Sequence, residues 1–252
     1  GDQLEMKVLV IGDSCKDVFV YGKCDRLSPA APVPVFVPVS HKENKGMAGN
    51  VWQNLVSFET LEVDLITNET EVTKTRYVHE STNHMFVRVD SGEEKIERIS
   101  NLDLINFDQY DAVIISDYNK GFLREADITK IGERHPLTFL DTKKLLGPWA
   151  ESITFIKINQ QEYDRTAHTL FNYDRLTGKL IVTLGSRGCR YRQRHFPVDK
   201  VEIKDPIGAG DSFLAALVFR YLHNNGLMQD AIKFANDCAS LVVQQKGVNT
   251  VR

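Results

Sequence analysis

The sequence predicts an α/β protein with an open, mostly parallel sheet, helices on both faces and a small β flap. Short apolar runs rich in β-branched residues indicate buried strands at residues 7–11, 63–66, 112–116, 137–140, 153–158 and 179–184, with an edge hairpin at 189–196. Apolar residues recur at helical spacing at 46–58, 123–133, 209–224 and 228–245. The length of 252 residues, 42% of them apolar, suits a single domain over residues 1–252.

The flap is predicted from two stretches rich in strand patterns. Residues 18–39 alternate between apolar and polar side chains and contain four prolines, which confine a strand to the edge of a sheet. Residues 73–79, 84–90 and 95–99 are short strand patterns separated by polar turns. We expect the segments 18–39 and 73–99 to pair as a small sheet that acts as a lid.

Charge and cysteine content narrow the class of partner. The 31 basic and 34 acidic residues give a net charge of −3, so nothing indicates a nucleic-acid or membrane partner, and small molecules are expected instead. The four cysteines are scattered, which is typical of reduced thiols, and the histidines lack metal-ligand spacing. The longest uninterrupted apolar run, 213–219, is too short to span a bilayer, and the N-terminus lacks a signal pattern. We expect a cytoplasmic protein.

The most informative segment is residues 205–213, where Gly208, Ala209 and Gly210 precede a long amphipathic helix. Backbone N–H groups at such a helix start can bind an anion. An acidic residue at the same place, Asp211, makes sense as a base that takes a proton from a hydroxyl attacking the bound phosphorus. It makes equal sense as a simple helix cap. Spacing alone leaves both interpretations open.

Residues 205–211 resemble the D-x-x-G-A-G-D signature of the ribokinase-like, PfkB-type sugar kinases. The resemblance implies the ribokinase-like fold, with Asp211 as the catalytic base and the amides of Gly208, Ala209 and Gly210 as the anion hole for the transferring phosphoryl group. In some relatives a monovalent cation such as K⁺ binds near the position of Asp205. The Walker pattern of P-loop kinases does not occur in the sequence.

Other segments resemble the same family in the same order and imply ATP and Mg²⁺ as cofactors. Residues 159–162 resemble its N-x-x-E motif, in which Asn159 and Glu162 would organise Mg²⁺, largely through water. The resemblance also implies further contacts to the nucleotide, from Gly185, Gly188, Asn236 and Gly247. Residues 12–17 resemble the family's G-D-x-x-x-D start, so Asp13 and Asp17 would accept sugar hydroxyls. On the residues alone, these two carboxylates are equally well a turn former and a solvated charge.

A narrower resemblance, to the D-glycero-D-manno-heptose-7-phosphate kinases of this family, lies in residues 21–35, 73–76 and 116–121, and more loosely in 141–143. It implies an acceptor that is itself phosphorylated. Lys and Arg neutralise phosphate by charge and geometry. The candidates for that contact are Lys74, Arg76, Arg88 and Lys143. Each is also readily explained as a solvated strand or loop charge.

The sequence departs from the family at two places. Met47 replaces the second glycine of the G-G-x-x-x-N pattern, although Gly46 and Asn50 remain as expected sugar contacts. The segment 66–73 is much shorter than in relatives, so we expect part of the sheet or the substrate side to be exposed, where a partner subunit could cover it. The resemblance also implies a homodimer formed through the lid, because flaps in this family often pair between subunits. The nucleotidyltransferase domain fused to some heptose kinases is missing from the sequence, so we expect the kinase step alone.

The sequence therefore predicts an ATP- and Mg²⁺-dependent carbohydrate kinase, with the anomeric hydroxyl of D-glycero-D-manno-heptose 7-phosphate as the expected acceptor. Two alternatives stay open. One is a kinase of the same family for another sugar, sugar phosphate or nucleoside. The other, suggested by Met47 and the short 66–73 segment, is a sugar- or nucleotide-binding module without catalysis.

Overall fold

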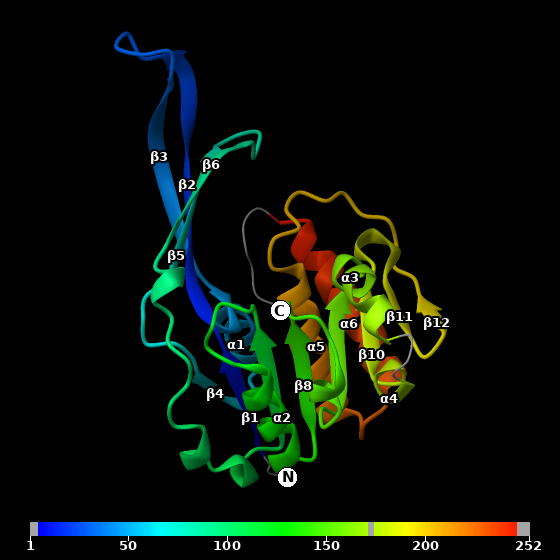
Figure 1. Ribbon diagram of the computed structural model, residues 1–252. Coiled ribbons are helices and arrows are strands. Elements are labelled where there is room, and N and C mark those ends of the chain that lie inside the picture. The colour runs from blue at the N-terminus through cyan, green and yellow to red at the C-terminus, as the bar shows by residue number, and fades with distance from the viewer. Residues whose placement is uncertain (1–4, 171–173, 246–252) are drawn as a thin grey trace.

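The computed structural model describes residues 5–170 and 174–245 (Figure 1). Its body is an eight-stranded sheet in the order β12-β11-β10-β9-β8-β7-β1-β4. The strands are β1 (Met6–Gly12), β4 (Leu61–Ile66), β7 (Ala112–Asp117), β8 (Thr138–Thr142), β9 (Phe155–Asn159), β10 (Leu180–Thr183), β11 (Cys189–Tyr191) and β12 (Arg194–Phe196). Six neighbouring strands pair in parallel, in the order β4, β1, β7, β8, β9 and β10. The β11–β12 hairpin continues the sheet with antiparallel pairing. The open, mostly parallel sheet is confirmed.

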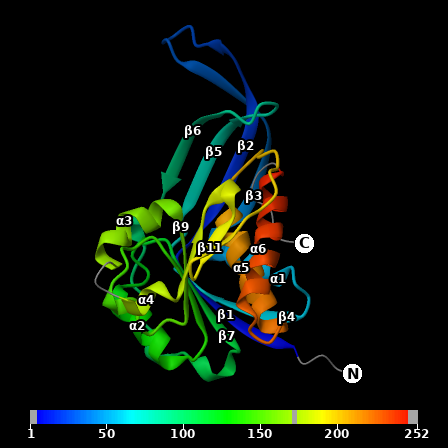
Figure 2. The same cartoon turned by 90° about the vertical axis from the view of Figure 1, so that its right-hand side faces the viewer.

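Helices cover both faces of the sheet. Successive strand residues point to opposite sides, and the strand residues on both sides are apolar, so each face needs a covering layer. In β1, Val8 and Val10 pack under α1 (Ala48–Val56), α5 (Ala209–His223) and α6 (Met228–Val243). Leu9 and Ile11 pack on the other face, toward α2 (Glu125–Arg134), α3 (Gln160–Leu170) and α4 (Asp174–Thr177). Figure 2 shows the two helical layers on either side of the strands. Every residue of β1 from Val8 to Ile11 is fully buried, which explains the unbroken apolar run.

Sequence reasoning missed α3 and α4. The buried residues of α3 are Glu162, Thr166 and Leu170, at i, i+4 and i+8. Two of these three are polar, so the buried stripe carries almost no hydrophobic signal. The polar members are satisfied inside the protein: the Thr166 hydroxyl accepts a hydrogen bond from the Leu146 N–H at 2.8 Å. Hydrophobic periodicity therefore gave no warning of this helix.

The lid is a second sheet in the order β3-β2-β5-β6 and stands away from the body (Figure 1). Its strands are β2 (Ser14–Leu27), β3 (Pro34–Met47), β5 (Thr73–His79) and β6 (Met85–Ser91). The expected pairing of the two segments is confirmed, and β2 and β3 extend beyond the expected range at both ends. Pro34 and Pro38 lie in β3, an edge strand, where a missing N–H is tolerated.

The expected strand at 95–99 is wrong. The chain leaves β6 through Gly92, whose φ is +92°, and forms a short 3-10 turn at Glu93–Lys95. A Cβ at Gly92 would lie 2.4 Å from the Glu71 carbonyl oxygen, so the turn packs tightly on the neighbouring chain. The residues that follow Lys95 cross back to the body, where Ile99 donates its N–H to the Phe122 carbonyl at 2.9 Å.

The short connection from β4 to β5 is fastened by hydrogen bonds to the start of β2. Asn68 accepts the Ser14 N–H at 2.7 Å and donates to the carbonyls of Ser14 and Thr70 at 3.2 and 2.7 Å. Strand β4 is the last strand of the body sheet. The Val63 carbonyl of this strand accepts a hydrogen bond from the Trp52 indole at 2.9 Å, which protects part of the exposed edge.

Within residues 5–170 and 174–245, no helix is both long and apolar enough to cross a membrane. The four cysteines, Cys15, Cys24, Cys189 and Cys238, are all free thiols.

We predict that Asn68→Ala lowers the free energy of unfolding by about 2 kcal/mol, because it leaves part-buried backbone groups at Ser14 and Thr70 without their partners. Chemical denaturation measures this change. Glu69→Ala, at an exposed neighbouring position, is the control and should change stability little. Equal effects of the two substitutions would contradict the role assigned to Asn68.

Candidate active site

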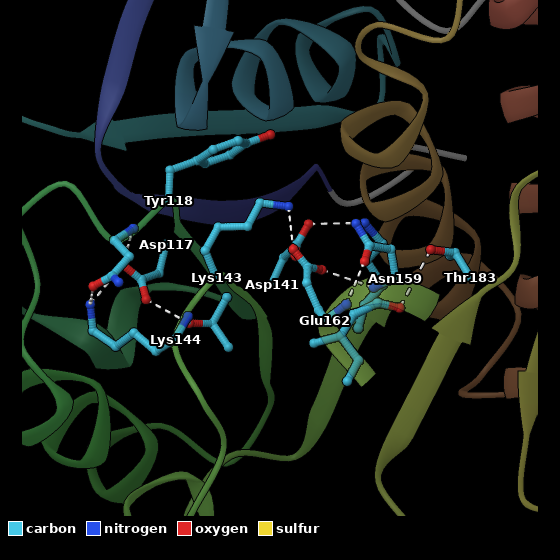
Figure 3. A network of polar contacts seen from close by, with 12 residues as sticks. Asp117, Tyr118, Asp141, Lys143, Lys144, Asn159, Glu162 and Thr183 are labelled. Atoms are coloured by element: carbon cyan, nitrogen blue, oxygen red, sulfur yellow. Dashed lines mark hydrogen bonds and ion pairs between the residues drawn. The ribbon is translucent and has the colours of Figure 1, made fainter. Parts of the chain in front are cut away.

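A cavity of about 610 Å³ opens at the carboxyl ends of the parallel strands, the usual ligand position in open α/β sheets. Four strands of the body contribute the end residues that border it: Tyr118 follows β7, and Asp141, Asn159 and Thr183 lie at the ends of β8, β9 and β10. The start of α5 closes the cavity from one side with Gly208, Ala209, Gly210 and Asp211. Figure 3 shows the polar side chains along the strand ends.

Glycine is required at the start of α5. Gly208 precedes the helix with a φ of +83°, a conformation that other residues rarely adopt. A Cβ on Gly210 would lie 2.9 Å from the Lys157 ammonium nitrogen, so the lysine and the helix start meet at one point. The N–H groups at the start of α5 and this ammonium therefore lie side by side at the cavity, although the Ala209 N–H also donates to the Pro206 carbonyl at 3.3 Å.

Asp211 lies in the first turn of α5 and is buried. Its two carboxylate oxygens accept different donors: Oδ2 from the Asn50 amide at 3.0 Å and Oδ1 from the Tyr118 hydroxyl at 2.7 Å. Asn50 is held in turn by Asn54, whose amide donates to Asn50 Oδ1 at 3.1 Å. The Ser212 hydroxyl donates to Asn54 Oδ1 at 3.1 Å, which closes the network between α1 and α5.

Burial raises the pKa of Asp211 to about 6. The hydrogen bond from Asn50 opposes this shift, the nearby charge of Asp141 adds to it, and Tyr118 and Lys157 favour the charged form. A carboxylate with a pKa near neutrality is ionised at pH 7 and yet basic enough to accept a proton during a reaction.

Lys157 and Asp141 form a buried ion pair beneath the start of α5, with Nζ and Oδ2 3.0 Å apart and both residues only 4% exposed. The other oxygen of Asp141, Oδ1, is buried and has no hydrogen-bond partner among the described residues. Sequence reasoning missed both residues as members of this pair. One feature of the sequence could have indicated Lys157: it is a charged residue inside the otherwise apolar strand at 155–158.

Asn159 and Glu162 form a reciprocal pair at the start of α3. The Asn159 N–H donates to Glu162 Oε1 at 2.9 Å, and the Glu162 N–H donates to Asn159 Oδ1 at 2.8 Å. Lys143 Nζ lies 2.5 Å from Glu162 Oε2. Lys143 was expected at the acceptor's phosphate, but the structure places it at the N-x-x-E motif (Figure 3).

The oxygen donors at this end of the cavity suit a magnesium ion. Mg²⁺ prefers oxygen ligands and usually keeps several waters. Asn159 and Glu162 offer such oxygens, but each is already engaged in the helix start, which favours contact through water. Asp141 also lines this cavity, and its buried Oδ1 has no hydrogen-bond partner among the described residues.

The lid contributes a second group of charged residues at its base. Asp17 of β2 and Arg76 of β5 form a buried ion pair at 2.7 Å. Gly46 allows this approach, because a Cβ there would lie 2.4 Å from Asp17 Oδ2. The Cys15 thiol lies between these groups and Asp211: burial raises its pKa to about 12, and the charges of Asp17, Lys74, Arg76 and Asp211 all act on it.

Two of the expected phosphate contacts have carboxylate partners instead. Lys74 Nζ lies 3.5 Å from Glu93 Oε1, and Arg88 pairs with Asp90 at 2.9 Å in an exposed part of β6. Arg88 is the register partner of Arg76 across β5 and β6, so the two guanidinium groups share one face of the lid.

Asp13 differs from expectation. It is fully buried, and its oxygens accept the N–H groups of Tyr118 at 2.6 Å and Lys120 at 2.8 Å. Asp13 therefore anchors the loop that follows β7, and its expected contact with the sugar stays a prediction. The choice between a turn former and a solvated charge, left open for Asp13, is settled against solvation.

The backbone conformation at Met47 explains why the family's G-G-x-x-x-N pattern has a glycine at this position. Met47 precedes α1 with φ +56° and ψ −132°, a backbone conformation that glycine adopts far more readily. Its side chain is buried against Cys15 and Val72, with Tyr118 and Ile96 beside them. The substitution thus exchanges backbone freedom for packing at the base of the lid.

Three of the residues expected to contact the nucleotide, Gly185, Gly188 and Asn236, line the cavity. Gly185 and Gly188 line it with φ of +60° and +89°, and a Cβ on Gly188 would lie 2.0 Å from the Phe196 carbonyl oxygen. Asn236 lines it as well, and its amide donates to that same carbonyl at 3.2 Å. Asp205 Oδ1 accepts the Ile207 N–H at 2.9 Å and shapes the loop before Gly208. Gly247 lies outside the described residues.

We predict that Asp211→Asn stabilises the protein at pH 8 by up to about 3 kcal/mol, because the raised pKa means that the folded state favours the neutral carboxyl. The folded state binds more protons than the unfolded state between pH 4 and 6, so the wild-type chain gains stability as the pH falls through that window. The advantage of the variant should therefore shrink from pH 8 to pH 4.

Chemical denaturation at several pH values measures this difference, with Asp108→Asn, at an exposed position, as the control. A pH-independent difference between Asp211→Asn and wild type would contradict the prediction.

Comparisons with known proteins agree with this geometry. Residues 140–252 match the profile of the pfkB family carbohydrate kinases. The bifunctional protein HldE of Helicobacter pylori strain HPAG1 is 30% identical over 299 aligned positions, covering 96% of this chain. The chain spans 63% of the length of that relative. Because 299 positions exceed the 252 residues here, at least 47 positions of the alignment have no counterpart in this chain.

Solved structures share the fold at low identity. Ribokinase from Thermotoga maritima superposes with a TM-score of 0.68 at 15% identity, over 96% of this chain and 94% of that one. Phosphofructokinase-2 from Escherichia coli, in complex with potassium, superposes with a TM-score of 0.64 at 14% identity, over 98% and 96% of the two chains. Over residues 140–252 the chain is similar to the pfkB family carbohydrate kinases, and over most of its length it resembles the part of HldE that it covers.

Proposed function

We propose that the protein transfers the γ-phosphoryl group of ATP to a sugar hydroxyl, with Asp211 as the base. The observation that carries this proposal is the buried Asp211 carboxylate at the start of α5, with a pKa of about 6 and with anion-binding N–H groups beside it. A helix cap has no need of burial, of two side-chain donors, or of a place on a cavity wall. These features favour the catalytic interpretation over the capping one.

In the proposed reaction the acceptor hydroxyl gives its proton to Asp211 as its oxygen bonds to the γ-phosphorus, and the bond from that phosphorus to the bridging oxygen of ADP breaks. The N–H groups of Gly208, Ala209 and Gly210 and the ammonium of Lys157 would hold the charge on the phosphoryl oxygens. Asn159 and Glu162 would hold Mg²⁺ largely through water, and the ion would neutralise the charge of the nucleotide phosphates. Gly185, Gly188, Asn236 and Gly247 would border the nucleotide.

For the acceptor we propose D-glycero-D-manno-heptose 7-phosphate, phosphorylated at its anomeric hydroxyl. The sequence resemblance in the lid and the similarity to HldE support this choice. Arg76 and Lys74 at the base of the lid are the cations that would bind the 7-phosphate, and Asp17, Gly46 and Asn50 would bind the sugar.

We also propose that a monovalent cation such as K⁺ binds near Asp205. ATP as donor and four free thiols are typical of the cytoplasm, where we place the protein.

We further propose a homodimer formed through the lid. Apolar side chains about half exposed lie on its two edge strands, Val37 and Val39 on β3 and Val87 and Val89 on β6. An exposed apolar edge strand is unfavourable in a monomer. A second copy of this chain offers the matching apolar surface and the matching strand edge.

We predict that, with Mg-ATP, purified protein releases ADP with heptose 7-phosphate and does so more slowly or not at all with fructose 6-phosphate, ribose, fructose or adenosine. Asp211→Asn should lower kcat by about 10²- to 10⁴-fold while leaving ATP binding nearly intact, because proton transfer is lost and the anion site remains. A coupled ADP assay measures both.

Turnover with another member of the panel would keep the mechanism and replace the acceptor. ATP binding without turnover on any member would favour a binding module. Undiminished turnover in Asp211→Asn would exclude Asp211 as the base.

We predict that light scattering shows a dimer and that Val87→Lys combined with Val89→Lys makes it monomeric, because two charges would be buried at the shared edge. Leu104→Lys, an exposed apolar position on the body, is the matched control and should leave the dimer intact. A monomeric wild-type chain at assay concentration would overturn the proposed dimer.

A further inference from the structure

Tyr118 contacts two residues that line the cavity, Asp211 at the start of α5 and Lys143 after β8. Its hydroxyl donates to Asp211 Oδ1 at 2.7 Å. On the other side, Lys143 Nζ lies 5.2 Å from the centre of its ring, and the same ammonium pairs with Glu162 at the proposed magnesium position. One side chain therefore contacts the base and the cation that accompanies the N-x-x-E motif. Figure 3 shows the ring above Lys143.

The backbone of Tyr118 is fixed by buried carboxylates. Asp13 accepts its N–H, and Asp117 accepts the Asn119 N–H at 3.0 Å. Asp117 also accepts the Thr142 hydroxyl at 2.6 Å, and its carbonyl accepts the Lys143 N–H at 3.0 Å. The loop after β7 is thus tied to β1 on one side and to the segment bearing Lys143 on the other. These hydrogen bonds fix the backbone at Tyr118 and so limit the directions that its ring can take.

We propose that Tyr118 is a positioning residue for phosphoryl transfer: its hydroxyl orients Asp211 toward the acceptor, and its ring holds Lys143 where the nucleotide phosphates bind. The inference rests on the proposed kinase function and deepens it. It also gives a use for the buried Asp13, which follows β1 and holds the backbone of Tyr118.

Several charges face Asp211 besides the two direct donors Asn50 and Tyr118. Asp141 repels its ionised form and Lys157 stabilises it. Its charge in turn acts on Lys143 and on the Cys15 thiol. Burial raises the pKa of Tyr118 well above its ordinary value, so the phenol stays a proton donor throughout the pH range of an assay. Removing that donor leaves every other charge in place and should make Asp211 harder to ionise.

The test compares two substitutions of Tyr118. Tyr118→Phe keeps the ring and loses the hydroxyl, so we expect kcat/KM at pH 7 to fall about tenfold or more and its acid limb to move up by about one pH unit, with little change in KM for Mg-ATP. Tyr118→Leu loses the ring as well, and we expect KM for Mg-ATP to rise in addition.

The matched control is Tyr110→Phe. Tyr110 is buried, and its hydroxyl donates to Asp64 at 2.7 Å on the other side of the body, so this variant loses a similar bond without touching the cavity. It should change stability and leave the pH profile unchanged. An acid limb that stays in place in Tyr118→Phe, or that moves equally in Tyr110→Phe, would overturn the proposal.

A stability measurement separates this inference from the kinase function. At pH 8, Tyr118→Phe should destabilise the wild-type chain more than it destabilises a chain that already carries Asp211→Ala, because the hydrogen bond exists only in the first. Equal losses in the two backgrounds would overturn the inference even if the protein is an active kinase. Unequal losses without turnover on any sugar would support the contact and count against the proposed function alone.

Discussion

The site depends on one constraint, the burial of the Asp211 carboxylate where the lid, the sheet and α5 meet. A buried carboxylate is costly unless donors surround it. Asn50 from α1 and Tyr118 from the loop after β7 supply these donors. Each donor is in turn fixed by buried partners, Asn54 and Asp13. Elements far apart in the sequence are thus held together by the need to satisfy one charge, and the same charge becomes the base of the proposed reaction.

The fold was predictable where local pattern and packing agree. The alternation of apolar strands and helices predicted the body sheet, because strands buried on both faces must be apolar throughout, as in β1. Helix α3 escaped because its buried stripe contains Glu162 and Thr166. The expected strand at 95–99 failed because the Gly92 turn, packed on the Glu71 carbonyl, ends the lid sheet, and no local pattern reveals that contact.

The candidate site was predictable as a set of residue types but not as a set of contacts. Residues 205–211 and 159–162 were the expected anion and magnesium sites, and Gly208, Asp211 and Asn159 from these segments line one cavity. Three assignments depended on tertiary structure. Asp13 is turned inward to two backbone N–H groups, Lys143 reaches Glu162, and Lys157 projects from a buried strand to the start of α5. Sequence spacing does not encode which way such side chains face.

The central claim is that Asp211 is a buried, ionisable base, and its carboxyl group can be observed directly. In ¹³C-aspartate-labelled protein the Asp211 carboxyl signal can be assigned from its loss in Asp211→Asn, and its chemical shift can be followed against pH without any substrate. The structure predicts a titration near pH 6, well above the ordinary aspartate range. A titration near pH 4 would contradict the account, because it would mean that burial does not disfavour the ionised carboxylate in the folded protein.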